Sequence, residues 1–122
     1  MNKTPETLEE CYLFLEKLDD IDTWLNHTES DAIVLAHHGI GRFIRNEWGL
    51  WSGGKLKDYF LDKGLHHPDD MSSVILTSFY RFKHNIDIKL EEQIEHYIEY
   101  WLTDNEKLLR KRKQKLEKLN EE

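Results

Sequence analysis

The sequence predicts an all-α protein, a compact bundle of about five helices with a long C-terminal helix. Apolar residues recur at steps of three and four along most of the 122 residues, and the alternation typical of strands is absent. Only two prolines, Pro5 and Pro68, interrupt the chain. The composition, 39% hydrophobic and 34% charged, suits one domain with a core. We therefore expect residues 1–105 to form a single helical domain and residues 106–122 a charged helical extension.

The first helix is expected to begin between Thr4 and Thr7. Pro5 suits a first turn, and Thr7 with Glu10 fits a capping box. The apolar stripe of this helix consists of Leu8, Cys11, Tyr12, Leu15 and Leu18.

A second helix is expected from about Ser30, a good N-cap residue, to Trp48. Gly39 and Gly41 lie inside it, and each costs about 1 kcal/mol relative to alanine. Either the helix is interrupted here, or another group packs closely against its backbone. Its apolar stripe consists of Ile33, Ala36, His37, Ile40, Phe43, Ile44 and Trp48.

The segment 49–54 (GLWSGG) breaks the helical pattern, and a short helix follows that Gly64 is well placed to end. Asp69 and Asp70 can cap a fourth helix, and a fifth is expected from about Ile88. The C-terminal extension could mediate a homodimer, although lysines interrupt the most obvious heptad pattern. The expected inward residues of the third to fifth helices are Leu56, Tyr59, Phe60, Val74, Ile75, Phe79, Phe82, Leu90, Ile94, Tyr97, Ile98, Trp101 and Leu102.

Charge is distributed unevenly. Residues 107–122 hold seven Lys or Arg and three Glu, a net charge of +4. Because the net charge of the whole chain is −7, the first 106 residues carry −11. An acidic body argues against nucleic-acid binding, because phosphate contacts need Lys and Arg. No apolar run approaches a membrane span, so we expect no membrane association. A single cysteine, Cys11, and no apolar leader indicate a cytoplasmic protein.

Unusual residues gather between His37 and Arg81. His38, Arg42 and Arg45 follow one another at steps of four and three, and Asn46 lies four positions after Arg42. Such a face could bind a carboxylate or phosphate. We favour the structural alternative, in which Arg42 or Arg45 forms a salt bridge with Asp69 or Asp70.

A second polar stripe, formed by Asp70, Ser73, Thr77 and Arg81, follows the fourth helix at similar steps. If this stripe faces the second helix, the two helices enclose a polar cleft with charges of both signs. The alternative is a polar face that points at water.

Two further groups have simple structural interpretations. His66, His67, Asp69 and Asp70 resemble metal ligands, but neighbouring histidines in a turn seldom point at one ion, and we expect neither a metal nor a cofactor. The aromatic turn formed by Trp48 and Trp51 is expected to anchor the core, and if exposed it would be a partner-binding hot spot.

Several catalytic classes are excluded. Pro68 separates His67 from Asp69, so the chain lacks the His-Asp dipeptide of a common class of phosphohydrolase. No His follows the Arg45-Asn46 pair within the spacing that one class of all-α ribonuclease requires. No glycine-rich phosphate loop is present, and Cys11 lies on an apolar stripe, where a nucleophile is poorly activated.

The stretches 38–51 (HGIGRFIRNEWGLW) and 66–76 (HHPDDMSSVIL), with Leu56, Tyr59 and Phe60 between them, resemble a bacterial and phage-associated family of unknown function. That family is marked by a Gly-Arg-x-Ile-Arg-Asn-x-Trp core and a His-Pro-Asp-Asp-Met-Ser motif. The resemblance extends from about Thr4 to Trp101 and excludes the basic tail. It implies that both polar clusters belong to one module, and it supplies no activity.

Two functional hypotheses follow. The first is a non-catalytic helical module that binds a protein partner, in an immunity, phage-defence or regulatory setting that the family's associations suggest. The second is a binding protein or hydrolase for a nucleotide or phosphoester. In it, His38 or His67 would act as acid or base, Arg42, Arg45 and Arg81 would hold the anion, and Asp69 or Asp70 would orient a histidine.

Overall fold

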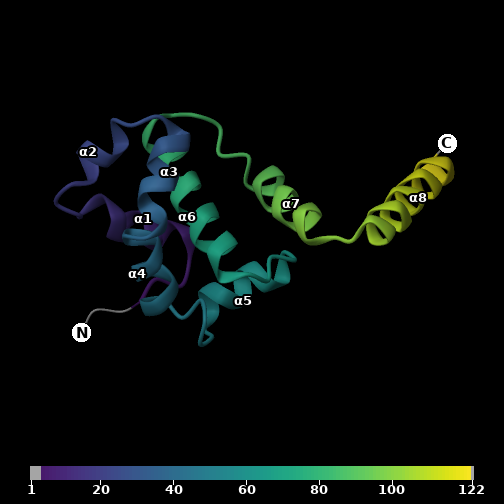
Figure 1. The fold of residues 1–122 in the computed structure, drawn as a ribbon, viewed down its shortest axis with the longest axis horizontal. Coiled ribbons are helices and arrows are strands. Elements are labelled where there is room, and N and C mark those ends of the chain that lie inside the picture. Colours follow the sequence, from purple (N-terminus) through teal and green to yellow (C-terminus); the bar gives the residue numbers. More distant parts are fainter. Residues whose placement is uncertain (1–3, 122) are drawn as a thin grey trace.

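The computed structural model describes residues 4–121, which form eight helices and no strand (Figure 1). The helices are α1 (Leu8–Glu16), α2 (Ile21–Leu25), α3 (Glu29–His37), α4 (Ile40–Glu47), α5 (Lys55–Asp62), α6 (Pro68–Lys83), α7 (Leu90–Trp101) and α8 (Asp104–Glu121). The predicted all-α class is confirmed, whereas the predicted number of about five helices is too low. No helix in this part of the chain is both long and apolar enough to cross a membrane.

The beginning of α1 is formed by the predicted cap. The Thr7 side chain accepts a hydrogen bond from the Glu10 backbone N–H at 3.2 Å, and the Glu10 carboxylate accepts one from the Glu6 N–H at 3.1 Å. After α1 the chain forms the short helix α2, which the sequence analysis missed. The indole N–H of Trp24 in α2 donates to the carbonyl of Ala32 at 2.7 Å and so ties α2 to α3.

The predicted second helix is two helices, α3 and α4. Thr28, rather than Ser30, caps α3, and Gly39 separates it from α4. We expected either an interrupted helix or close packing against the backbone at the two glycines, and both occur. The chain breaks at Gly39, and a Cβ on Gly41 would lie 2.9 Å from the backbone oxygen of Ala36, so the backbone packs closely there.

In the loop between α5 and α6, Gly64 ends α5 as predicted, whereas the residue that caps α6 differs from the predicted aspartates. Gly64 has φ +92°, the left-handed conformation that favours glycine after a helix. The residue that caps α6 is His67, whose ring nitrogen accepts the N–H of Asp69, and Pro68 occupies the first turn. The prediction that the aspartates are the caps is wrong, because Asp69 and Asp70 already lie within the first turn.

The C-terminal part contains a second unpredicted break. The backbone becomes extended at Leu102, with φ −73° and ψ 140°, and Thr103 accepts the Glu106 N–H to begin α8 as a separate helix. Figure 1 shows α7 beside the bundle and α8 extending away from it.

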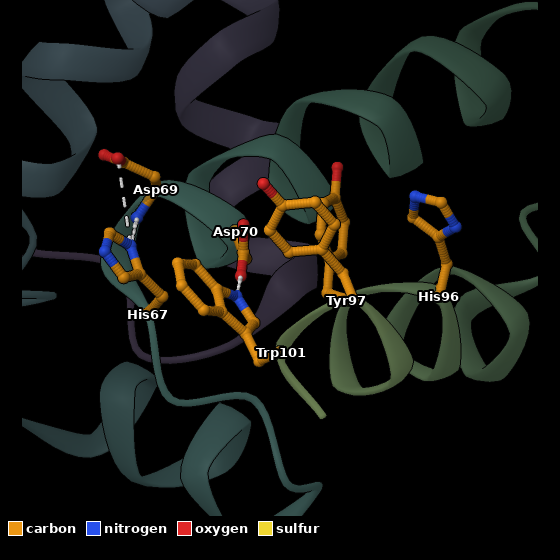
Figure 2. A pocket seen from close by; sticks show the side chains of 7 residues that line it. His67, Asp69, Asp70, His96, Tyr97 and Trp101 are labelled. Atoms are coloured by element: carbon orange, nitrogen blue, oxygen red, sulfur yellow. Dashed lines mark hydrogen bonds and ion pairs between the residues drawn. The ribbon is translucent and has the colours of Figure 1, made fainter. Parts of the chain in front are cut away.

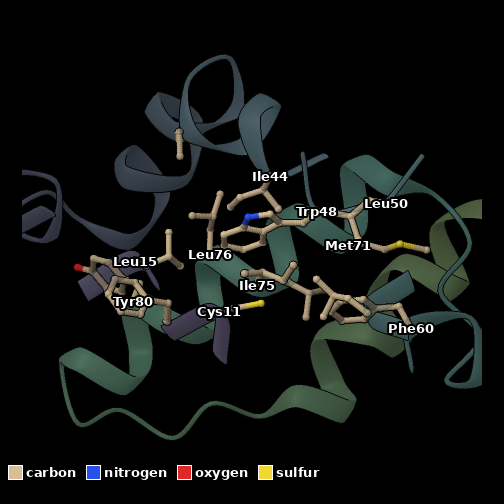
Figure 3. Packing of buried hydrophobic residues seen from close by; sticks show 14 of the residues in the cluster. Cys11, Leu15, Ile44, Trp48, Leu50, Phe60, Met71, Ile75, Leu76 and Tyr80 are labelled. Carbon is tan, nitrogen blue, oxygen red and sulfur yellow. The ribbon is translucent and has the colours of Figure 1, made fainter. Parts of the chain in front are cut away.

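The core surrounds α6, which contacts α1, α3, α4 and α7 (Figure 3). Nine of its 16 residues are buried. Of the two tryptophans predicted as core anchors, Trp48 is 4% exposed and packs in the core, whereas Trp51 is 54% exposed. The prediction for Trp51 is therefore wrong, because the turn that follows Gly49 carries this side chain to the surface. The largest fully buried side chains include Leu15, Ile44, Leu50, Leu56, Phe60, Leu65, Met71, Ile75 and Phe79.

Candidate functional site

The guanidinium of Arg45 joins the two sequence motifs. Its Nη1 donates to the Ser72 hydroxyl at 3.0 Å, its Nη2 donates to the His37 carbonyl at 2.9 Å, and its Nε lies 3.1 Å from the Asp69 carboxylate. Arg45 is only 7% exposed. Each of its three nitrogens thus has a partner, drawn from the end of α3 and the first turns of α6.

The neighbouring residues complete this polar lock, which we define as Arg45, Asp69 and Ser72. The Ser72 hydroxyl donates to the Asp69 carbonyl at 2.9 Å, so it accepts from Arg45 and donates within α6. A Cβ on Gly41 would lie 3.2 Å from Arg45 Nη1, so the small residue leaves room for the guanidinium. The structure thus contains the interhelical salt bridge that the sequence analysis favoured, made by Arg45 and Asp69.

The other polar residues of the second helix do not join the lock. His38, Arg42 and Asn46 are exposed, and His38 lies in the break between α3 and α4. The shared face expected for Arg42 and Arg45 is therefore divided. Arg45 points into the bundle, and Arg42 has no salt bridge within residues 4–121.

The polar stripe of α6 divides between two neighbours: Asp70 faces α7, whereas Thr77 and Arg81 line a cleft that residues of both α3 and α7 border. Asp70 accepts the indole N–H of Trp101 at 2.7 Å. The expected cleft between this stripe and His38, Arg42 and Arg45 is not formed. The physical reason is that Asp69 and Asp70 are about 100° apart around the helix axis, so they face different neighbours.

Arg81 lies near the far end of α6. Its guanidinium donates to both carboxylate oxygens of Glu29, at 2.7 and 3.1 Å, and to the Ile88 carbonyl at 2.8 Å. The hydrogen bond with Glu29 raises the pKa of Arg81. Twelve helical positions separate Arg81 from Asp69, or about 18 Å along the axis. Arg45 and Arg81 therefore cannot hold one small anion together.

A cleft of about 320 Å³ lies between the beginning of α6 and the end of α7 (Figure 2). The His67 ring stacks on Trp101, with ring centroids 5.3 Å apart and planes at 8°, and Trp51 meets the same imidazole edge-on at 6.1 Å. The residues that line the cleft are His67, Asp69, Asp70, His96, Tyr97, Tyr100 and Trp101.

The electrostatics of this cleft differ between its two carboxylates. Asp69 is paired with Arg45. Asp70 accepts a neutral indole N–H and has no cationic partner among residues 4–121. Nδ1 of His67 accepts from a backbone N–H, so a neutral ring carries its proton on Nε2. Burial raises the pKa of Tyr97, which stays a neutral hydroxyl.

The aromatic wall of the cleft, formed by Tyr97, Tyr100 and Trp101, was missed by the sequence analysis, which assigned Tyr97 and Trp101 to a buried stripe. Tyr100 and Trp101 are 69% and 58% exposed. The available signal was the pairing of two large aromatic residues at adjacent positions. Adjacent residues on a helix are about 100° apart, so both seldom reach one core.

Two other candidate chemistries find little support in the geometry. No group of three or more His, Cys, Asp or Glu in the described part of the chain is arranged to hold a metal ion. Burial raises the pKa of the Cys11 thiol to about 12, so the nucleophilic thiolate is disfavoured.

A family model described as a domain of unknown function, DUF6794, matches residues 4–83. The chain belongs to the DUF6794 family. Neither a curated protein nor a solved structure matches it. The DUF6794 match ends at Lys83, the last residue of α6, and not near Trp101 as the resemblance suggested. The polar lock therefore lies within the DUF6794 domain, whereas α7 and α8 lie outside the match.

Proposed function

We propose that this DUF6794 protein is a non-catalytic helical module that recognises another protein. The observation that carries the proposal is the full use of Arg45 in internal contacts, which removes the strongest candidate for a binding or catalytic cation. The resemblance to phage-associated bacterial proteins makes an immunity, phage-defence or regulatory role the natural context, in a bacterial cytoplasm.

A surface around the break between α3 and α4 suits such recognition. Val34 and Leu35 are 73% and 57% exposed, and the exposed polar residues His38 and Arg42 follow three and seven positions after Leu35. We call these four residues the junction surface. Exposed apolar side chains beside an unpaired guanidinium combine the area and the charge that protein interfaces use.

The test is site-specific photo-crosslinking in lysate of the source cells. A photoreactive residue in place of Leu35 should capture a discrete partner band, and Val34→Asp should reduce that band by tenfold or more in the same protein. Asp62→Asn, at an exposed position of α5, is the matched control and should leave capture unchanged. A band that persists equally with Val34→Asp, or no band in repeated lysates, contradicts recognition at this surface.

The alternative function, binding or hydrolysis of a nucleotide or phosphoester, receives less support. Its three proposed anion-holding arginines do not converge, because Arg45 and Arg81 are occupied at different ends of α6 and Arg42 points outward. The cleft that contains His67 is lined by no Lys or Arg. Its carboxylates would repel a phosphate rather than bind it.

A further inference from the structure

Helix α8 is amphipathic and is not covered by the rest of the chain. Four leucines lie on about 100° of its circumference, and each is 49–63% exposed. Four lysines form a row directly beside them, spaced at four, four and three positions. Apolar surface of this kind beside a basic row indicates a docking helix. The leucines are Leu108, Leu109, Leu116 and Leu119, and the lysines are Lys107, Lys111, Lys115 and Lys118.

Pairing of two α8 helices as a coiled coil is disfavoured. Arg112 lies in the middle of the leucine face, midway between Leu109 and Leu116 on the α8 surface. A parallel pair in register places Arg112 against its own copy, and an antiparallel pair that matches Leu109 with Leu116 places Arg112 opposite Lys113 and one position from its own copy. Two guanidiniums at such a position repel one another in a partly desolvated interface. The partner of α8 should therefore be acidic and apolar.

The cleft between α6 and α7 has this complementary chemistry. Three aromatic rings, two histidines and two carboxylates line it, and Asp70 lacks a cationic partner within the described chain. The faces of aromatic rings attract ammonium and guanidinium groups. A volume of about 320 Å³ can admit the end of a lysine side chain.

An apolar groove of about 590 Å³ continues from this cleft and shares His67, Tyr97 and Trp101 with it. Leu65, Ile98 and Leu102 supply its other principal apolar side chains. The acidic aromatic cleft and the apolar groove thus lie side by side, as do the lysine row and the leucine face of α8. The two surfaces therefore match in chemistry.

The α8 helix of the same chain borders the groove only through Glu106 and contributes no residue to the cleft. Arg110 in α8 lies 2.5 Å from the carboxylate of Glu95 in α7, which holds the first turns of α8 on that flank of α7. Tyr100, in the wall of the cleft, is roughly 140° around the α7 axis from Glu95. Beyond Arg110, α8 leads away from the bundle (Figure 1).

We propose that α8 of one copy docks on the cleft and groove of a second copy, in a reciprocal two-fold dimer. Lys111 and Lys115 approach Asp70 and the aromatic wall of the partner, while the leucines cover the partner's groove. This rests on the proposed interaction function and names one partner, the chain itself. The opposite charges of the body and the tail, −11 and +4, favour the encounter. Reciprocal exchange closes the assembly at two copies.

The test is sedimentation equilibrium of the full chain from micromolar to millimolar concentration. The wild type should show a monomer–dimer equilibrium that weakens in about 1 M salt, where the screening length is only about 3 Å. Asp70→Asn keeps an acceptor for the Trp101 indole and removes the charge. It should raise the dimer dissociation constant on the order of tenfold, because both symmetric contacts change.

Two further variants separate docking from folding. Tyr100→Ala removes an exposed ring of the cleft and leaves the bond between Asp70 and Trp101 intact, and it should also weaken the dimer. Lys111→Glu with Lys115→Glu reverses the basic row and should give a monomer. Circular dichroism should show unchanged helicity for the cleft variants, so that a loss of dimer reports docking.

A mixing experiment tests the reciprocal geometry. The Asp70→Asn chain retains a normal α8, and the Lys111→Glu, Lys115→Glu chain retains a normal cleft. A mixture should form a heterodimer with one intact contact, more stable than the homodimer of the Lys111→Glu, Lys115→Glu chain.

Three results overturn the inference: a wild type that is monomeric throughout, a dimer indifferent to Asp70→Asn and Tyr100→Ala, or no gain on mixing. None of them affects recognition at the junction surface, which the crosslinking experiment tests separately.

Discussion

Arg42 and Arg45 are three positions apart on α4 and lie in opposite environments. Arg42 is exposed, whereas Arg45 is 7% exposed and makes contacts with Ser72, His37 and Asp69. A planar guanidinium with several donors suits a site that needs partners in three directions, and a lysine ammonium does not reproduce that geometry. At the scale of the residue, the lock therefore depends on the shape of the side chain as well as on its charge.

Arg45→Lys is expected to destabilise the protein by about 2–3 kcal/mol, because it leaves buried acceptors without donors while it keeps the charge. Arg42→Lys is the matched control on the same helix and should change the free energy of unfolding by less than about 0.5 kcal/mol. Urea unfolding followed by circular dichroism measures both. Equal effects of the two substitutions would show that the contacts of Arg45 contribute little to stability.

At the scale of the element, α6 organises the molecule. In its first turn Asp69 pairs with Arg45 of α4 and Asp70 accepts a hydrogen bond from Trp101 of α7. In its last turn Arg81 pairs with Glu29 of α3. The helix begins with His67, an unusual cap whose ring also stacks on Trp101 and meets Trp51. A single imidazole thus joins the beginning of α6 to the aromatic wall of the cleft.

Substitutions of His67 separate the cap from the aromatic contact. His67→Ala should cost about 1 kcal/mol or more, because the Asp69 N–H loses its acceptor and the ring stack is lost. His67→Asn restores a good cap without the ring and should recover most of that loss. Thermal or urea unfolding gives the comparison. If the His67→Asn and His67→Ala variants are equally destabilised, then His67 stabilises the protein through its stack with Trp101 and not through the cap.

At the scale of the whole molecule, the chain is a DUF6794 domain followed by two further helices. The family match ends with α6, yet α7 packs against that helix through Ile94, which is 4% exposed, and through Trp101. The α8 helix has no buried residue between Asp104 and Asn120. The two added helices therefore differ in their contribution to the fold.

Removal of residues 104–122 should leave the melting temperature within about 2–3 °C of the wild type, at a concentration low enough to keep both proteins monomeric. Removal of residues 84–122 should cost about 2–4 kcal/mol, because it uncovers the side of α6 that Ile94 and its neighbours bury. Differential scanning calorimetry compares the two truncations. A large loss on removal of α8 alone would contradict its independence from the monomer fold.

Much of the fold was available from local patterns. The Thr7 cap, the stop at Gly64 and the fourth helix were predicted because caps, glycines and apolar spacing act within a few residues. The breaks at Gly39 and Leu102 were missed as definite boundaries, because their sequence signals also fit a continuous helix. The outward turn of Trp51 depends on the φ angle of +75° at Gly49, which composition does not reveal.

The sequence by itself determined the helical class, most of the stripes that form the core, and the gathering of polar residues between His37 and Arg81. Only the tertiary structure decided which of these residues meet. In the structure Arg45 forms a salt bridge with Asp69, Asp70 accepts a hydrogen bond from Trp101, and Arg81 forms a salt bridge with Glu29. The physical reason is that adjacent side chains point about 100° apart around a helix axis. The rotation of each helix about its axis decides which neighbour a side chain meets, and packing between distant parts of the chain sets that rotation.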